Sequence, residues 1–210
     1  MPNPIFAQKP VKEINCPQCG YPLPIYFQYT KLLECPSCRS TIFLDDEVAR
    51  VRGDSSALTE EPSLIKLHQL FKFESHSYLP VGKIRYSYGR GFWEEWFLKR
   101  NDGASWWLSI DEGDFVLERE VSLDLIGDFD VDNLKIGNFV GDFMVTEIAT
   151  GECKGFAGEL PEPIEIGAKH GYIHFQGEAG ELLTLEYSAN GEKKLFRGRW
   201  IDPFEIEISI

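Results

Sequence analysis

From Leu67 to the end of the chain, apolar and polar side chains alternate with a period of two residues. Short runs rich in aromatic and β-branched residues are separated by turn sequences such as Asn101-Asp102-Gly103 and Asp111-Glu112-Gly113-Asp114. Such runs with Gly-containing turns between them are typical of consecutive β-hairpins. Almost no stretch has the 3.6-residue period of an amphipathic helix. The pattern therefore predicts an all-β domain over residues 64–210, built as an antiparallel β-barrel or sandwich.

The same pattern restarts about halfway through this domain. The spacing of the apolar residues from Phe139 to Ile148 resembles the spacing from Phe71 to Ile84. Between the two halves, residues 123–133 contain four aspartates and are expected to form a loop or a single helical turn. We interpret residues 64–122 and 134–210 as two small β units, an internal duplication packed into one barrel or sandwich.

Two Cys-x-x-Cys pairs stand ahead of this domain, with fifteen residues between them. Their members are Cys16, Cys19, Cys35 and Cys38. Pairs at this spacing are typical of a structural zinc site, in which four thiolates complete the tetrahedral coordination and leave no position for water or substrate. The sequence therefore predicts one structural Zn²⁺ per chain, bound in a zinc ribbon that the metal helps to fold.

Two other chemistries remain open for these cysteines. Cys-Pro-x-Cys-Gly turns also bind iron in rubredoxin-like proteins, and paired cysteines can form disulfides. The short spacer favours zinc over iron, as does Arg39 at the position after the second pair, where the first pair has Gly20. The fifth cysteine, Cys153, has no partner and is expected to be a small buried residue.

Changes in composition divide the chain into three parts. Residues 1–44 contain the ribbon and a proline-rich, extended lead-in. Residues 45–63 are charged, short of large apolar side chains and broken by glycine, serine and proline, so we expect a linker there. Residues 64–210 form the β domain.

The charge of the chain is unevenly distributed. The net charge is −13, and residues 53–210 carry 15 Lys and Arg against 29 Asp and Glu. Nucleic-acid binding depends on Lys and Arg contacts with phosphates, so an acidic domain disfavours that partner. No apolar run reaches the length of a membrane span, and the first residues lack the form of a signal peptide. With thiolates that must stay reduced, these features predict a cytoplasmic protein.

Outside the cysteines, the segment Trp93-Glu94-Glu95-Trp96 is the sharpest candidate for chemistry. On a strand, Trp93 and Glu95 share one face and Glu94 and Trp96 share the other. A glutamate desolvated against tryptophan can have a raised pKa and act as an acid, with Glu159 or Glu186 as a second carboxylate. Alternatively, the tryptophans fill the core and a glutamate pairs with Arg85, Lys99 or Arg100. With Trp107, the four residues are also a candidate binding surface, because Trp, Tyr and Arg are enriched at interface hot spots.

Other catalytic signals are weak. The chain has no Gly-x-Ser-x-Gly elbow and no phosphate-binding loop. His170 and His174 would lie on one face of a strand, yet roughly 13 Å apart by rise per residue, which is too far to share one ion. No catalytic residue is predicted on these grounds.

Several short motifs of the β domain occur in the order found in one bacterial family. They are Phe92-Trp93-Glu94-Glu95-Trp96, Trp107-Leu108-Ser109, Gly158-Glu159-Leu160-Pro161, Leu183-Thr184-Leu185-Glu186 and Gly198-Arg199-Trp200. On these motifs, residues 65–205 resemble the bacterial domain-of-unknown-function family 4178. The resemblance implies an amino-terminal zinc ribbon ahead of the domain, as in other members. It implies no particular activity, because the family has no established chemistry.

These observations predict a non-enzymatic cytoplasmic adaptor that binds a partner protein through the ribbon and the acidic all-β domain. Two alternatives follow from other features. The ribbon, with Lys and Arg residues between Lys9 and Arg52, could contact nucleic acid. A carboxylate-dependent enzyme could be centred on Glu94 or Glu95 in the Trp-Glu-Glu-Trp strand.

Overall fold

The computed structural model describes residues 10–45, 48–53, 58, 62–127, 129–188 and 190–209. This part of the chain is nearly all β, with a few single turns of 3₁₀ helix. The strands are β1 (Lys12–Asn15), β2 (Pro22–Ile25), β3 (Leu32–Glu34), β4 (Thr41–Asp45), β5 (Val48–Gly53), β6 (Phe71–Phe73), β7 (His76–Ser87), β8 (Phe92–Arg100), β9 (Ser105–Asp111), β10 (Asp114–Val121), β11 (Phe139–Val140), β12 (Phe143–Leu160), β13 (Lys169–Gln176), β14 (Glu181–Ser188), β15 (Lys193–Ile201) and β16 (Glu207–Ile208). The 3₁₀ turns are η2 (Leu123–Leu125), η3 (Val131–Asn133), η4 (Glu178–Gly180) and η5 (Pro203–Glu205).

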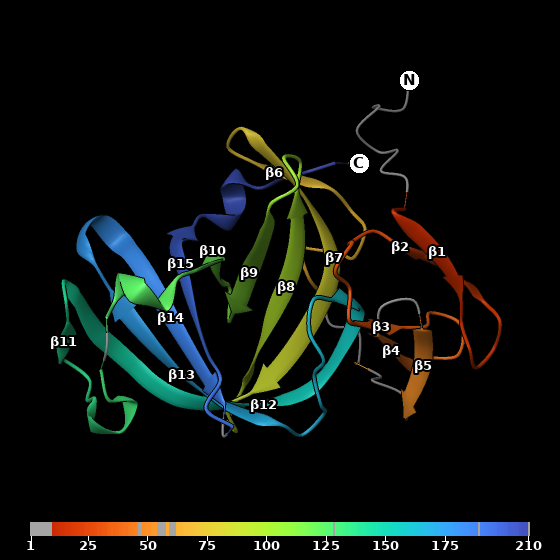
Figure 1. Ribbon diagram of the computed structural model, residues 1–210. Helices are drawn as coiled ribbons and strands as arrows, with labels where there is room; N and C mark the ends of the chain where they lie inside the picture. The colour runs from red at the N-terminus through yellow and green to blue at the C-terminus, as the bar shows by residue number, and fades with distance from the viewer. Residues whose placement is uncertain are drawn as a thin grey trace.

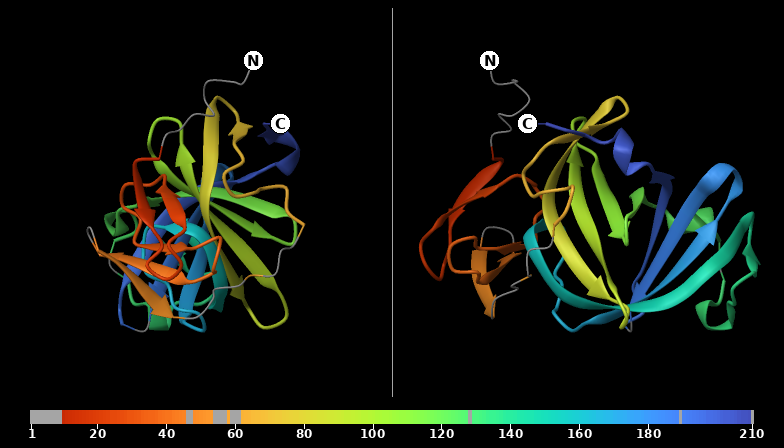
Figure 2. Two further views of the ribbon diagram at one scale, coloured as in Figure 1. Left: turned by 90° about the vertical axis from the view of Figure 1, so that its right-hand side faces the viewer. Right: turned by 180° about the vertical axis from the view of Figure 1, so that it is seen from behind.

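Eight of the strands form a ring. Their order is β7-β8-β9-β10-β15-β14-β13-β12, and β12 pairs again with β7. Each neighbouring pair is antiparallel. In Figures 1 and 2 the two sides of the ring converge where β7 meets β12 and diverge toward the other end. The predicted antiparallel β-barrel is thus confirmed.

The two halves of the domain repeat one arrangement. Strands β7 to β10 form one four-stranded meander and β12 to β15 form another, and each meander is preceded by a short hairpin strand, β6 or β11. The halves meet first strand to first strand, through β7 and β12, and last strand to last strand, through β10 and β15. This repetition agrees with the two β units expected from the spacing of the apolar residues.

The outer faces of the barrel are apolar and covered. Side chains of β8, β9 and β10, such as Leu98 and Leu108, pack with β6 and the C-terminal segment that includes Ile206. Those of β13 to β15, such as Phe175, pack under the segment between β10 and β12. Because side chains alternate along a strand, the residues between these positions face the lumen. That face carries an apolar cluster beside β7 and β12 and, elsewhere, polar side chains.

The cysteine-containing module joins the barrel through strand β12. This strand pairs with β7 over residues 152–158 and then with β3 through Glu159 and Leu160. Strand β5, within the expected linker, pairs with β4 and extends the module beyond residue 44. The linker prediction is therefore wrong for residues 48–53, because a six-residue strand with two arginines and few apolar residues leaves little apolar pattern in the sequence. Most of the remaining linker and the lead-in up to residue 9 lie outside the described residues.

A buried carboxylate fastens the module to the barrel. Glu159 is only 3% exposed, and it accepts hydrogen bonds from the Tyr26 N–H (2.8 Å), the Phe27 N–H (3.0 Å) and the Thr30 hydroxyl (2.8 Å). Phe27 then lies edge-on against Phe97 of β8, with ring centroids 4.9 Å apart. The loop of the module therefore packs into the side of the barrel lumen.

Replacing Glu159 with Gln should weaken this attachment. An amide has one acceptor oxygen, and its N–H₂ group would face backbone N–H donors, so at least one buried donor would lose its partner. We expect the free energy of unfolding to fall by about 2 to 3 kcal/mol, measured by urea denaturation. Hydrogen exchange should rise at Tyr26 and Phe27. The exposed Glu178→Gln is the matched control, and equal stability of the two variants would contradict this role.

Candidate functional site

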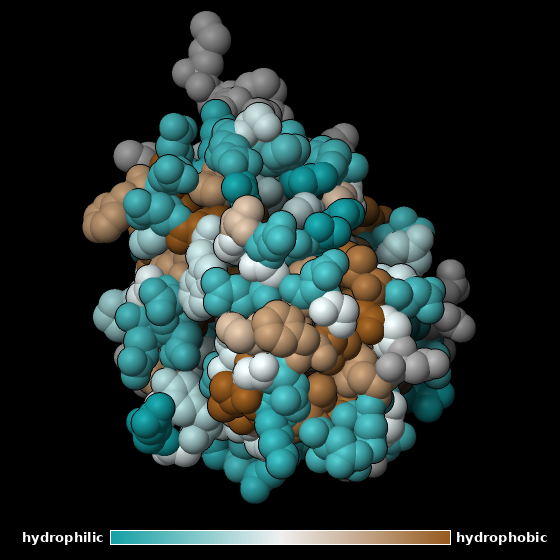
Figure 3. Space-filling model, turned by 90° about the vertical axis from the view of Figure 1, so that its left-hand side faces the viewer, coloured by the Kyte–Doolittle hydropathy of each residue, from teal (hydrophilic) through white to brown (hydrophobic). Residues whose placement is uncertain are grey.

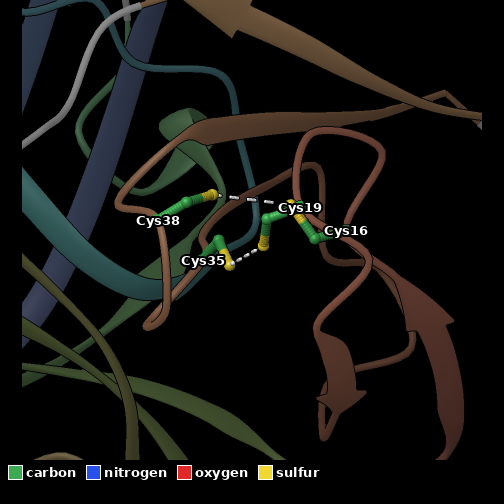
Figure 4. Close-up of side chains that lie close together, drawn as sticks. All are labelled: Cys16, Cys19, Cys35 and Cys38. Atoms are coloured by element: carbon green, nitrogen blue, oxygen red, sulfur yellow. Dashed lines mark hydrogen bonds between the residues drawn. The ribbon is translucent and has the colours of Figure 1, made fainter.

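The four cysteines lie together at the tips of two turns (Figure 4). Their sulfur atoms are all within 4.8 Å of one another, and the Cys16–Cys38 and Cys19–Cys35 Sγ distances are both 3.7 Å. Tetrahedral coordination with Zn–S bonds of about 2.3 Å places sulfur atoms about 3.8 Å apart. The cluster thus has the donor type, number and spacing to hold one metal ion.

The two turns have the same backbone geometry. The N–H of Gly20 donates to the carbonyl of Cys16, and the N–H of Arg39 donates to the carbonyl of Cys35, both at 2.8 Å. Gly20 (φ 76°) and Arg39 (φ 62°) both have left-handed backbone conformations. The left-handed region favours glycine, so Arg39 adopts a conformation that is uncommon for a residue with a side chain, and the second turn keeps the shape of the first. A tetrahedral ion held by all four sulfurs would have no open coordination position.

The Trp-Glu-Glu-Trp segment is split between the two faces of β8. Trp93 and Glu95 face the lumen, whereas Glu94 and Trp96 face outward. Glu94 is 6% exposed and accepts from Arg85 Nη2 at 2.6 Å and from Lys83 Nζ at 3.0 Å. The predicted alternative that a glutamate of this segment pairs with Arg85 is confirmed.

The five residues proposed as a binding surface do not form one. Trp93 is 7% exposed, Trp96 is 2% exposed, and Trp107 packs against Phe97 with ring centroids 5.0 Å apart. Both faces of β8 are covered. The apolar cluster inside the lumen packs on one face, and β6 with the C-terminal segment packs on the other.

The barrel lumen contains a cavity of about 320 Å³. Seven of the eight ring strands contribute side chains to its wall, all except β7. Six of these side chains are carboxylic acids: Glu95, Asp111, Asp114, Glu118, Glu147 and Glu186. Aromatic rings, two histidines and hydroxyl groups complete the wall, and none of the described residues that line it is Lys or Arg.

Glu95, Glu118 and Glu186 are the least exposed of these six carboxylic acids. Glu95 accepts a hydrogen bond from the Trp93 indole N–H at 2.8 Å. Glu118 accepts one from the Thr184 hydroxyl at 3.0 Å, across the intervening strand β15. The residue paired with Glu118 on β15 is Gly198, where a Cβ atom would come within 2.5 Å of the Glu118 Cβ. Among the described residues, none donates a hydrogen bond to Glu186.

These three carboxyl groups favour their protonated forms. Burial raises the pKa of Glu95 to about 7, although the Trp93 indole opposes the shift. Burial, with a smaller contribution from the charge of Glu95, raises the pKa of Glu118 to about 8. Burial also raises the pKa of Glu186 well above its usual range, and the charges of Glu95 and Glu118 add to the effect. The lumen therefore contains carboxyl groups that can donate or accept protons near neutral pH.

Aromatic rings and histidines surround one end of the cavity. Trp93 stacks on Tyr86 at 5.0 Å and meets Tyr172 edge-on at 5.3 Å. His170 lies edge-on to Tyr86 at 4.5 Å, and its buried Nε2 atom has no hydrogen-bond partner among the described residues. Burial lowers the pKa of His170 to about 4, so the ring is neutral at physiological pH.

His174 occupies the same wall of the cavity as His170, as expected for residues four apart on a strand. Its Nδ1 atom lies 3.2 Å from a Glu147 carboxylate oxygen, and Tyr172 donates to the other oxygen at 3.1 Å. The hydrogen bond with His174 lowers the pKa of Glu147. The two histidines therefore have different surroundings, since His170 packs against the Tyr86 ring and His174 interacts with Glu147.

Cys153 is 1% exposed and packs in the apolar cluster beside β7 and β12. Burial raises the pKa of its thiol to about 11, so the thiol is protonated and unreactive at neutral pH. The prediction of a small buried residue is confirmed.

Sequence reasoning identified Glu95 and Glu186 as candidate partners but missed Glu118 and Thr184. The even spacing of Leu182, Thr184 and Glu186 along β14 is the only sequence signal that these side chains share a face. Glu159, the other suggested second carboxylate, holds the cysteine-containing module in place instead.

In the part of the chain that the structure describes, no helix has the length and apolar character needed to cross a membrane.

Comparison with known proteins places the domain in a family. A search of curated proteins and a search of solved structures each found no match. The profile of one protein family, a domain of unknown function named DUF4178, matches residues 66–203. The matched range runs from just before β6 to η5 and therefore includes the whole ring of strands. The chain belongs to the DUF4178 family.

Proposed function

We propose that this protein is a small-molecule-binding barrel whose lumen is the binding site and whose four cysteines hold a structural Zn²⁺. The observation that carries the proposal is the cavity of about 320 Å³ inside the ring, which both polar and apolar side chains line. Ligand pockets are typically concave, about 300 to 1,000 Å³ in volume, and partly lined by aromatic side chains with a few convergent polar groups. The lumen has this size and this composition.

The surrounding structure supports the assignment. In the barrel, two apolar clusters face outward and are covered by connecting segments, so the apolar cluster beside β7 and β12 needs to fill only part of the lumen. Eight strands enclose an interior just wide enough to hold one small ligand. Burying a carboxyl group such as Glu118 with few hydrogen-bond partners costs free energy. Such groups are concentrated at functional sites, which points to a role in recognition.

The expected adaptor role is the second candidate, and it would use a different face. Exposed apolar side chains gather on the face that carries β11 and the segment before it (Figure 3). They include Leu125 (43% exposed), Ile136 (67%) and Phe139 (67%). Exposed apolar patches of this kind are typical of protein-docking sites. This surface is outside the barrel and does not involve the Trp-Glu-Glu-Trp strand.

Filling the lumen tests the main proposal. Ser109 faces the cavity from the middle of β9, and Ser105 is exposed at the start of the same strand. We would measure binding of 2-phenylethanol, 2-phenylethylamine and 3-phenylpropionate to the wild type, Ser109→Phe and Ser105→Phe by ligand-observed NMR. At least one compound should bind the wild type and Ser105→Phe, with binding lost in Ser109→Phe. Failure of all three to bind, or equal binding by both variants, would contradict a lumen site.

A further inference from the structure

The charged groups around the lumen are all of one sign. Six carboxylic acids line it, and no Lys or Arg stands among the described residues of its wall. Two other carboxyl groups are buried among the described residues. Glu94 pairs with Arg85 and Lys83, and Glu159 accepts hydrogen bonds from two backbone N–H groups and the Thr30 hydroxyl. The lumen carboxyl groups have fewer partners than either of these.

The acceptor capacity of these carboxyl groups is largely unused. An ionised carboxylate offers about four lone-pair sites for hydrogen bonds. Glu118 is 6% exposed, yet among the described residues it receives one hydrogen bond, at Oε2. Glu95 likewise receives one, from Trp93, and Glu186 receives none from the described residues. Carboxyl groups with lone pairs free for further hydrogen bonds therefore line one cavity from three strands, β8, β10 and β14.

A small metal ion does not suit this arrangement. Calcium needs six to eight oxygen ligands at about 2.3 to 2.6 Å, which requires their side chains to be nearly in contact. Among the described residues, the four cysteines are the only group of three or more potential ligands with donor atoms within 4.8 Å of one another. The lumen carboxyl groups are more widely spaced, so a larger cation that spans them is the better complement.

The aromatic wall suits the same kind of ligand. Trp93, Tyr172 and Tyr86 form a continuous set of rings beside the carboxyl groups. The negative face of an aromatic ring attracts a cation, most strongly for tryptophan. His170 beside them is neutral at physiological pH and therefore does not repel a positive charge.

We propose that the lumen binds an organic cation with N–H donors, a protonated amine or a guanidinium group, held by Glu95, Glu118 and Glu186 with its apolar part against Trp93. This inference rests on the lumen being a binding site, and it names the chemical class of the ligand. Ammonium and guanidinium groups supply several charge-assisted hydrogen bonds, each stronger than a neutral one. The net charge of −13 also attracts cations toward the protein.

The test compares three compounds of nearly equal size and different charge. At pH 8, with Glu95 largely ionised, wild-type protein should bind 2-phenylethylamine at least tenfold more tightly than 2-phenylethanol and should not bind 3-phenylpropionate. Isothermal titration or ligand-observed NMR would give the affinities. This comparison uses the wild type alone, so it does not depend on the folding of a variant.

One charge-removing variant locates the cation. Glu95→Gln should weaken 2-phenylethylamine binding about tenfold, with 2-phenylethanol changed less than twofold. Glu207→Gln, an exposed change of the same charge on β16, should leave both affinities within twofold of the wild type. Equal weakening by Glu207→Gln would assign the effect to overall charge and overturn the proposal.

The outcomes separate the two levels of the proposal. If 2-phenylethanol binds in a manner that Ser109→Phe abolishes, and 2-phenylethylamine binds no more tightly, the lumen site stands and the cation class is wrong. If none of the compounds binds, both proposals are wrong.

Discussion

Removal of the metal should unfold the cysteine-containing module and leave the main sheets of the barrel folded. The buried core of the module is small, and two of its members, Cys16 and Cys35, belong to the group of four candidate metal ligands. Structural zinc typically contributes about 10 kcal/mol or more to modules of this size. We therefore expect about one equivalent of zinc per chain, and chelation should expose the backbone amides of β1 to β5 to hydrogen exchange while β9, β10, β14 and β15 stay protected.

The location of the ion can be tested with two serine variants. Cys19→Ser removes one of four ligands and should reduce the bound zinc to well below one equivalent, with the same loss of protection in β1 to β5. Cys153→Ser changes a cysteine that is buried in the barrel cluster and should keep the full equivalent. Elemental analysis gives the metal content. Zinc-free protein with protected β1 to β5 amides, or equal zinc loss in both variants, would contradict a structural metal centre.

Loss of the module should also loosen one side of the barrel. Phe27 and Leu32 of the module belong to the same apolar cluster as Phe97 and Leu160 of the barrel. A metal ion bound by the cysteines would thus support the lumen indirectly, because the module that it stabilises includes the loop that covers this inner face. A protein whose module has unfolded would keep the two covered outer faces of the barrel and lose part of the lumen wall.

The features that the sequence predicted well are local ones. Turn sequences such as Asn101-Asp102-Gly103 and alternating apolar residues are sufficient to predict hairpins, because both depend on neighbours in the chain. The cysteine centre was predictable for a similar reason, since each turn is encoded by five consecutive residues. The repeated meander was visible because both halves use the same spacing of large apolar side chains.

The site in the lumen could not be predicted, because it depends on pairing between distant strands. Glu118 meets Thr184 only because β10 and β14 both flank β15, where the residue paired with Glu118 is Gly198. Hydrophobic alternation also leaves open which face of the sheet points into the barrel. An outward-facing apolar stripe looks the same in sequence as an inward-facing one, and the covering segments decide which face is buried. Strand β12, which passes from the barrel to the module, likewise has no local signal for the point where its partner changes.

The stability of the barrel should fall as the pH rises from about 5 to about 8, and Glu118 should account for a large part of the change. Its pKa is raised to about 8 by burial and by the charge of Glu95 on β8, with the Thr184 hydroxyl opposing the shift. The unfolded chain has a glutamate pKa of about 4.3. Between these two values the folded state keeps a proton that the unfolded state has released, so the free energy of unfolding falls by about 1.4 kcal/mol per pH unit for this group.

Comparison with Glu118→Gln isolates this contribution from every other titrating group. Glutamine resembles the protonated acid and can still accept from Thr184, so the variant should match the wild type near pH 5 and exceed its free energy of unfolding by on the order of 4 kcal/mol above pH 8. Thiolate ligation of the metal titrates in both proteins alike and cancels in the difference. For the exposed Glu120→Gln on the same strand, the curve of unfolding free energy against pH should run parallel to that of the wild type.

Urea denaturation at several pH values gives these curves. A Glu118→Gln curve parallel to that of the wild type would mean that Glu118 is already ionised in the folded protein. Glu118 would then need a cation beside it in the lumen at all times, because the barrel itself supplies none among its described lining residues.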